Sequence, residues 1–574
     1  MSRRLLVSIA LVVIGLGGAV VLWRARSLST VLPTVAEAAD EAGAHPALSS
    51  HGVLAAEGGA VLREQLIPAR VRRLSNNEYS SSVHALLQTA LVPGADFAPD
   101  ARQSGFTENE AQRIDTVLAK QVSLAAERLA SEARGRVASL APCATPADPE
   151  VCAQAFIADF GARVYRRRLV QEESAGLLEV FRAGALAASY ADGIELVVRA
   201  LLQSAGFLYL TELGAQAATD GQNDPEVALT GHEIASELAY LITGGPPDAK
   251  LLVAAANGSL ERPDERRSQL QRLRAEYPES RERLVRVLRE WLQLDAIENT
   301  AKDITFYPSY ELLWRHFITE SHAFIAAVLD QTDKPNSDLS TLLAANWTVG
   351  DKILGDFYGA EVEPDGRLKL AARRGLLNQG AFLSVQAHAR ASAPVLRGAL
   401  IARRLACIPV PAPGTVGISV LPPPPDPKLT TRQRFDLHAT NPTCADCHAK
   451  IDDFGNAFEH YDGMGALRQT ESELAVDSAT TIAVGADFDG TYADSNALAE
   501  ALARSPTVQE CFARYLFRAA AARSGDSSAA SDTSRSEDAF IAEWRTRSER
   551  ERGNVLDTLD AWVSSRLFTQ RRSL

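Results

Sequence analysis

The sequence lacks the motifs by which most enzyme classes are recognised. It has no glycine-rich loop of the kind that binds phosphates, and no Ser, His and Asp residues are spaced for nucleophilic catalysis. With 72 acidic residues, a carboxylate pair for glycoside hydrolysis cannot be singled out. An excess of positive charge is also missing, because the net charge is −13 and the pI about 5.4. This charge argues against nucleic acid as a partner, whereas a cationic electron-transfer partner would be compatible.

Cysteine is scarce as well, with six in 574 residues. Two of them lie in the segment Cys444-Ala-Asp-Cys447-His448, which is the pattern of covalent c-type haem attachment. Two thiols separated by two residues reach the two vinyl groups of the porphyrin, and the following histidine becomes an axial ligand of the iron. The alternatives are a redox-active cysteine pair, half of a zinc site, or an accidental match. A zinc site needs four ligands, and no second closely spaced cysteine pair completes one.

The second axial position of such a haem is left open by the sequence. Met464 is the only methionine after the initiator, and it either binds the iron or fills a gap in the core. His388 and His460 are rival ligands. An open sixth position would favour small-molecule chemistry over pure electron transfer.

The four remaining cysteines are an even number, as expected for a protein in an oxidising compartment. Cys143 and Cys152 flank a short loop with two prolines, so we expect them to pair. This leaves Cys407 to pair with Cys511 across a loop that contains the haem motif. The alternative for the second pair is two buried free thiols.

The N-terminus predicts export. Met1-Ser-Arg-Arg4 precedes an apolar run, Leu5–Trp23, which is close to the length that spans a bilayer. Because no small-x-small cleavage site follows directly, we expect residues 1–26 to be an uncleaved anchor in the inner membrane rather than a cleaved signal. Residues 27–66 would be a tether, and the remainder would face the periplasm or the cell exterior, where c-type haem is attached.

The rest of the chain is dominated by helical patterns. Ser75 and Thr230 each begin a capping box, with glutamate three residues later, before apolar residues at helical spacing. The proline-rich segment 409–427 is expected to be extended, Thr481–Val484 to be a short strand, and Ser524–Glu537 a disordered loop. The sequence therefore predicts a mainly α, multi-helical fold made of several small helical domains, with a cytochrome-c-like haem segment and little β structure.

Several segments, taken in order, resemble a family of secreted bacterial proteins built from the domains of unknown function DUF1587, DUF1595, DUF1592, DUF1588 and DUF1585. The corresponding segments are Arg73–Tyr79, Phe160–Leu169 with Leu201–Tyr209, Leu229–Leu252, Arg374–Leu383 with Phe458–Gly463, and Asn496–Arg523. The domains would occupy residues 67–140, 141–215, 225–360, 366–468 and 480–574.

This resemblance implies a c-type-cytochrome-like haem motif and export, and the family is sometimes linked to breakdown of complex polysaccharide. The chain departs from the family pattern at two places. Glu237 and Thr243 stand where the third segment usually has Arg and Trp, and Ala387-His388-Ala389 replaces a Ser-His-Pro motif.

The function expected from these observations is periplasmic or cell-surface electron transfer by one covalent haem c, with a redox protein as partner. One alternative is a haem-dependent oxidoreductase linked to polysaccharide breakdown, with a polysaccharide-related complex as a candidate partner. Another is a structural or interaction protein without haem, in which Cys444 and Cys447 form a disulfide.

Overall fold

The computed structural model describes residues 65–143, 148–214, 226–331, 337–410, 423, 426–439, 445, 447–523, 532–548 and 551–573. The predicted anchor and nearly all of the predicted tether lie outside these ranges. Leu66, the last residue assigned to the tether, is fully buried. Within the described ranges, no helix has both the length and the apolar character needed to cross a membrane.

The first group of helices surrounds one hydrophobic core made from α2, α3 and α5–α8. The group contains α2 (Asn76–Leu87), α3 (Thr116–Gly135), α4 (Val137–Leu140), α5 (Pro149–Tyr165), α6 (Gln171–Ala187), α7 (Tyr190–Leu202) and α8 (Ala205–Leu208), with the short 3-10 helix η2 (Pro93–Asp96). The predicted capping box is confirmed at the start of α2. Glu78 N donates to Ser75 Oγ over 3.1 Å, and Ser75 N donates to the Glu78 carboxylate over 2.8 Å.

The other helices of the described residues follow in the chain, and all of them except α18 contribute side chains to a second, larger core. They are α9 (Gly231–Thr243), α10 (Ala249–Ala256), α11 (Pro263–Glu276), α12 (Glu279–Trp291), α13 (Tyr310–Leu329), α14 (Asp338–Ala344), α15 (Lys352–Tyr358), α16 (Gly380–Val385), α17 (Pro394–Arg404), α18 (Thr431–Ala439), α20 (Asp452–Asn456), α21 (Ser495–Arg504), α22 (Pro506–Ala520), α23 (Asp532–Arg545), α24 (Val555–Ser564) and α25 (Arg566–Thr569). Three 3-10 helices join them: η3 (Ser259–Glu261), η4 (Leu294–Asn299) and η5 (Leu376–Asn378). The second predicted capping box, at Thr230, begins α9.

The described strands form only two-stranded antiparallel pairs. The pairs are β1 (Arg70–Arg73) with β2 (Tyr209–Glu212), β3 (Glu226–Ala228) with β10 (Gln570–Arg572), β4 (Trp347–Val349) with β5 (Arg367–Lys369), β6 (Thr470–Glu471) with β7 (Leu474–Ala475), and β8 (Thr480–Ile482) with β9 (Gly490–Tyr492). The mainly α prediction is confirmed, and β8 overlaps the short strand expected at Thr481–Val484.

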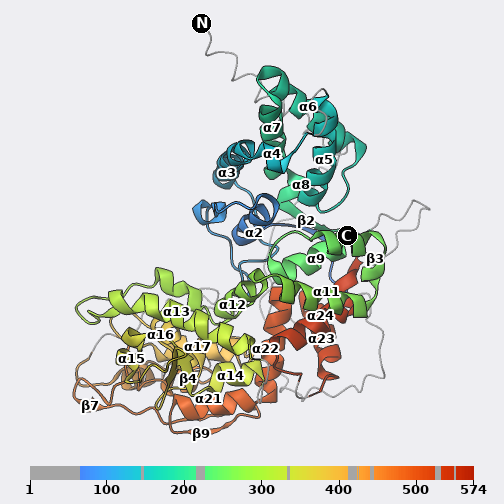
Figure 1. The fold of residues 1–574 in the computed structure, drawn as a ribbon. Helices are drawn as coiled ribbons and strands as arrows, with labels where there is room; N and C mark the ends of the chain where they lie inside the picture. Colours follow the sequence, from blue (N-terminus) through green and yellow to red (C-terminus); the bar gives the residue numbers. More distant parts are fainter. Residues whose placement is uncertain are drawn as a thin grey trace, which may run out of the picture. The chain divides into compact units, whose positions relative to one another are not determined.

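Segments far apart in the sequence are joined where β10 pairs with β3 and α24 packs on α11 (Figure 1). At this junction Arg571 of β10 and Arg70 of β1 both donate to the fully buried carboxylate of Glu212, over 2.6 and 2.7 Å. The two guanidinium groups compensate the burial of that charge, and the bonds tie the end of the chain to β1 and β2.

The prediction of a disordered loop at Ser524–Glu537 is wrong for residues 532–537, which belong to α23. Glu537 is buried and accepts hydrogen bonds from Arg514 over 2.9 Å and from Arg518 over 2.6 Å. Because both arginines lie on α22, this helical turn is stabilised by tertiary ion pairs that a local composition count does not include.

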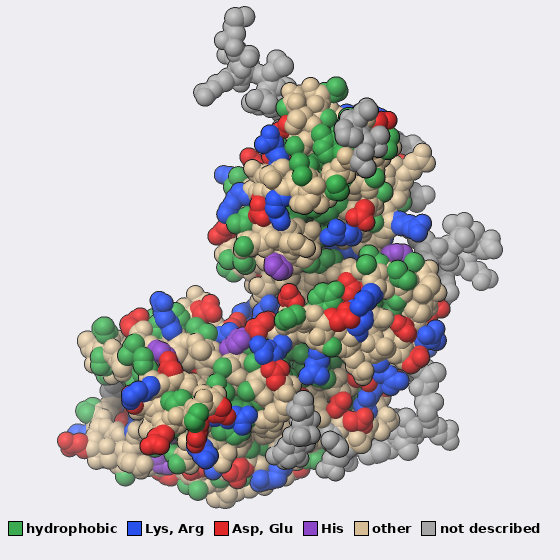
Figure 2. Space-filling model, in the orientation of Figure 1, with side chains coloured by type: hydrophobic (Ala, Val, Ile, Leu, Met, Phe, Trp, Pro, Cys, Tyr) green, Lys and Arg blue, Asp and Glu red, His purple; other side chains and the backbone are tan. Residues whose placement is uncertain are grey.

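On the face drawn in Figure 2, side chains of both charges are interspersed.

Candidate functional site

His448 lies in a helical turn immediately before α20. Ala449 N donates to Ala445 O over 2.9 Å, and Ile451 N donates to His448 O over 3.1 Å. His448 as a whole is 8% exposed. Cys447 is half-buried and has a free thiol. Cys444 is outside the described residues, so the alternative of a Cys444–Cys447 disulfide involves a residue whose placement is not described.

A carboxylate orients the imidazole. Nδ1 of His448 lies 2.9 and 2.8 Å from the two carboxylate oxygens of Asp452, which is one helical turn further along the chain. A carboxylate only accepts hydrogen bonds, so Nδ1 carries the proton and the lone pair of the neutral ring is on Nε2. In many metal-binding histidines, the ring nitrogen that does not bind the metal donates a hydrogen bond to a carboxylate. The donor chemistry of Cys447 and His448 therefore fits a covalently attached haem.

Close packing against α17 holds α20 in place. A Cβ atom at Gly398 would lie 1.9 Å from Ile451 O, and one at Gly455 would lie 1.8 Å from Pro394 O. Neither contact is sterically allowed, so both positions require glycine for this approach. The position of the turn that carries His448 is thus determined by the contact between α17 and α20.

Arg397 on α17 holds the segment that follows α20. Its guanidinium is fully buried and donates to four main-chain carbonyls, those of Leu383, Phe458, Tyr461 and Asp462, over 2.7–3.2 Å. Three of these carbonyls belong to the Phe458–Gly463 motif. Sequence reasoning did not single out Arg397, because nothing in a lone helical arginine indicates which distant carbonyls it will bind.

Met464 lies in the second hydrophobic core and is 7% exposed. Its Sδ is 3.9 Å from the Ser309 hydroxyl, and its carbonyl accepts a hydrogen bond from Ser384 over 3.1 Å. These contacts are with the start of α13 and with α16, and no described bond joins Met464 to Cys447 or His448. A role of Met464 as an axial ligand stays a prediction.

The two rival histidines have different surroundings. His388 is half-buried, and its pKa is lowered by burial and by the nearby positive charges of Lys302 and Arg434. Lys302 also donates to the His388 carbonyl over 3.0 Å. His460 Nδ1 bonds instead to the Ser478 hydroxyl. In the part of the chain that the structure describes, no group of three or more His, Cys, Asp or Glu side chains is arranged to hold a metal ion.

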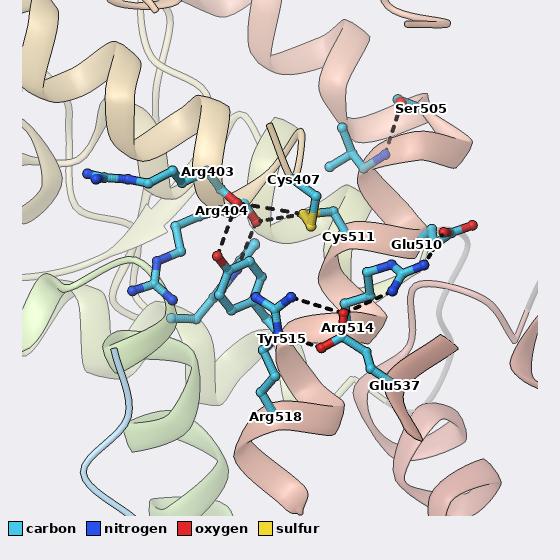
Figure 3. The surroundings of a disulfide bond; sticks show 12 residues. Arg403, Arg404, Cys407, Ser505, Glu510, Cys511, Arg514, Tyr515, Arg518 and Glu537 are labelled. Carbon is cyan, nitrogen blue, oxygen red and sulfur yellow. Dashed lines mark hydrogen bonds and ion pairs between the residues drawn. A yellow bond between two sulfur atoms is a disulfide. The ribbon is translucent and has the colours of Figure 1, made fainter. Parts of the chain in front are cut away.

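Both predicted disulfides are present, Cys143–Cys152 and Cys407–Cys511, with Cα separations of 5.1 and 5.5 Å. The second joins the residue three positions after α17 to α22 (Figure 3). Beside it the last carbonyls of α17 are capped by side chains. The Tyr515 hydroxyl donates to Arg403 O over 3.1 Å, and Trp291 Nε1 donates to Arg404 O over 3.2 Å. These bonds end α17 at residue 404 and fix the start of the stretch that leads to Cys444.

One of the two departures from the family pattern, Glu237 with Thr243, lies on α9. The other, Ala387-His388-Ala389, follows α16. Glu237 is buried, and burial raises its pKa to about 7, with a further increase from Glu212. One of its carboxylate oxygens has no hydrogen-bond partner. Arg70, Arg72 and Arg571 lie near enough to lower this pKa. Thr243 is the last residue of α9, and its hydroxyl donates to Ala239 O over 2.9 Å.

Four family models match the chain, and each is described as a protein of unknown function. They are DUF1587 over residues 72–135, DUF1595 over 152–212, DUF1592 over 229–360 and DUF1588 over 373–471. The chain is a multi-domain protein built from these domains. They follow the order that the motifs predicted. The fifth domain of the resemblance, DUF1585, is not among the four matches and stays a prediction.

The DUF1588 match contains the whole candidate site: Cys444, Cys447, His448, Asp452 and Met464. Comparison with curated protein sequences and with solved structures gave no match.

Proposed function

We propose that this multi-domain protein carries one covalent haem c in its DUF1588 domain and transfers electrons outside the cytoplasm. The observation that carries the proposal is the Cys444-x-x-Cys447-His448 motif together with the bond from His448 to Asp452. The motif alone also occurs by accident. A buried imidazole whose Nδ1 proton is held by a hydrogen-bond acceptor is typical of histidines that bind a metal, and an accidental sequence match does not by itself supply that acceptor.

Each residue has a separate role in this proposal. The thiols of Cys444 and Cys447 attach the porphyrin, and the imidazole of His448 binds the iron. Asp452 holds the ring orientation and makes the imidazole a stronger donor. The bound haem supplies a one-electron couple. Met464, His388 and His460 remain the candidates for the second axial position.

Export supports the same proposal. The two disulfides, Cys143–Cys152 and Cys407–Cys511, are typical of an oxidising compartment, which is also where c-type haem is attached. The apolar run Leu5–Trp23 would hold the protein at the inner membrane, with the helical body in the periplasm or at the cell surface. A redox protein would then be the partner.

A pyridine haemochrome spectrum of the protein made in a cytochrome c-maturing host tests the proposal. We expect a c-type spectrum with one haem per chain, and none from a variant with Cys444→Ala and Cys447→Ala. The His448→Ala variant should keep the thioether bonds but shift the Soret band, because it loses the proximal ligand. Absence of covalent haem in the unmodified protein would overturn the proposal. A high-spin spectrum with ligand binding at the iron would favour the oxidoreductase alternative.

A further inference from the structure

A cavity of about 970 Å³ lies away from the candidate haem segment. Its walls come from α2, the segment 88–92, α5, the turn Thr243–Asp248 after α9, and the region where α11 meets α12. These elements belong to the DUF1587, DUF1595 and DUF1592 matches, so the cavity is formed where three domains meet. Ligand sites of proteins occur preferentially at such junctions, and the volume is near the upper end of their usual range.

One wall of the cavity is a row of polar side chains on α2. Asn77, Ser81 and His84 all line the cavity, and their spacing of four and three residues puts them on one face of the helix. His84 Nδ1 lies 2.8 Å from Thr89 O, so it donates its proton to that carbonyl. In the neutral imidazole the other ring nitrogen, Nε2, is then a hydrogen-bond acceptor. This row therefore offers both hydrogen-bond donors and hydrogen-bond acceptors.

The part of the lining that comes from residues 243–279 is mainly apolar. Pro246 and Pro247 follow α9, and Leu252 on α10 and Tyr277 before α12 lie beside them. Such flat apolar groups pack well against the face of a ring. This part of the lining is held by Asp248, whose carboxylate accepts hydrogen bonds from Arg272 over 2.7 Å and from the Tyr277 hydroxyl over 2.8 Å.

The charged groups at the cavity have protein partners or are in solvent. Arg272 compensates Asp248, and Arg163 lies 3.8 Å from Asp159. Glu279 is exposed. A charged ligand would find no opposite charge reserved for it in the interior of the cavity. The lining therefore selects a neutral molecule with an apolar face and hydrogen-bonding groups along one edge.

We propose that this cavity binds a neutral ring compound that carries several hydroxyl groups. The ring faces pack against Pro246, Pro247 and Tyr277, and the hydroxyl groups bond to Asn77, Ser81 and His84. Two sources share this chemistry, a saturated sugar ring and an aromatic phenol. The site does not depend on haem, so it stands or falls independently of the electron-transfer proposal.

Saturation-transfer NMR on the full chain, with cellobiose and resorcinol as separate probes, tests this inference. We expect at least one probe to bind, and the probe that binds identifies the sugar or the phenol source. Ala85→Trp should occupy part of the cavity and weaken binding about tenfold or more. Ala119→Trp is the matched control, because Ala119 is also an exposed helical alanine but does not line the cavity.

His84→Phe provides a second variant that keeps the ring volume and removes the acceptor nitrogen. It should also weaken binding about tenfold, while circular dichroism shows an unchanged helix content. This variant decides the question if Ala85→Trp fails to fold. Absence of binding by both probes overturns the inference. Binding that is the same in folded Ala85→Trp or His84→Phe as in the unmodified chain overturns it as well.

Discussion

The carboxylate of Asp452 lies 2.8 Å from Nδ1 of His448, in the first turn of α20. The two residues are four positions apart, so a single helical turn places them together. The bond gives the imidazole a defined tautomer and orientation before any haem is attached. A histidine of the Cys-x-x-Cys-His motif is thereby joined to a negative charge that the motif itself does not contain.

Asp452→Asn should raise the reduction potential of the haem. Loss of the carboxylate makes the imidazole a weaker donor and removes a negative charge, and both changes favour the reduced iron. We expect an increase of roughly 50 mV, close to a tenfold change in the one-electron equilibrium constant. Spectroelectrochemical titration measures it. Asp453→Asn is the matched control, because Asp453 bonds to Thr480 and not to His448. Equal potentials in the two variants would contradict the role of Asp452.

Met464→Ala should lower stability, and an unchanged haem spectrum in this variant would mean that Met464 only fills the core. The side chain is buried in the second core, and truncation of a buried methionine costs about 2–5 kcal/mol. Met464→Leu conserves the volume and should cost less than about 1.5 kcal/mol. Urea unfolding gives the stabilities, and absorption spectra of the oxidised protein give the ligation. Loss of a weak sulfur-to-iron band near the red end in both variants would instead identify Met464 as the axial ligand.

The Cys407–Cys511 disulfide should contribute more to stability than Cys143–Cys152. Its cysteines are separated by 104 positions, against 9 for the other pair. In the chain-entropy model these loops correspond to about 4.7 and about 2.6 kcal/mol. Double Cys→Ala variants of each pair, compared by urea unfolding, check the order. A larger loss from removal of the short loop would contradict it.

Stability should fall as the pH rises from about 5 to about 8, and Glu320 should cause part of the fall. Burial raises the pKa of Glu320 from 4.5 to about 7, although Tyr358 donates a hydrogen bond to its carboxylate. The folded state therefore binds the proton more tightly than the unfolded state. The stabilisation that this proton provides is complete below the pKa of Glu320 in the unfolded state. It is lost as the pH rises through the pKa of Glu320 in the folded state.

Glu320→Gln should remove the contribution of Glu320 to the pH dependence. That contribution is a decrease of about 3 kcal/mol in the free energy of unfolding between about pH 5 and about pH 8. Glu237, whose pKa is also about 7, keeps its own share. Urea unfolding at several pH values measures the effect, and Glu311→Gln, at an exposed position of the same helix, is the control. An unchanged slope in Glu320→Gln would show that this carboxyl titrates near its ordinary pKa.

The apolar run Leu5–Trp23 should remain on the mature protein. No small-x-small site follows it directly, so signal peptidase has no ordinary place to cut. Mass spectrometry of the N-terminal peptide of the protein from membranes checks this. A mature start near residues 30–40 would mean cleavage and a soluble periplasmic protein.

Local sequence patterns were sufficient to predict many of the helices and the pairing of the cysteines in this protein. The capping boxes at Ser75 and Thr230 use groups three residues apart, and the helical periodicity uses neighbours three and four residues apart. Pairing of the cysteines followed from their number, the compartment and the short loop between Cys143 and Cys152. In each of these cases the interacting groups are close in sequence or very few, so the alternatives could be counted.

Only the tertiary structure decided how distant groups compensate one another. Arg397 bonds to four carbonyls, three of them about sixty positions away, and Arg571 reaches Glu212 from the other end of the chain. The cavity beside α2 likewise takes its walls from three domains. A sequence pattern reports the period and polarity of one segment. Which polar groups must share a buried space depends on the packing of all segments together, because an unpaired buried charge is far costlier than an exposed one.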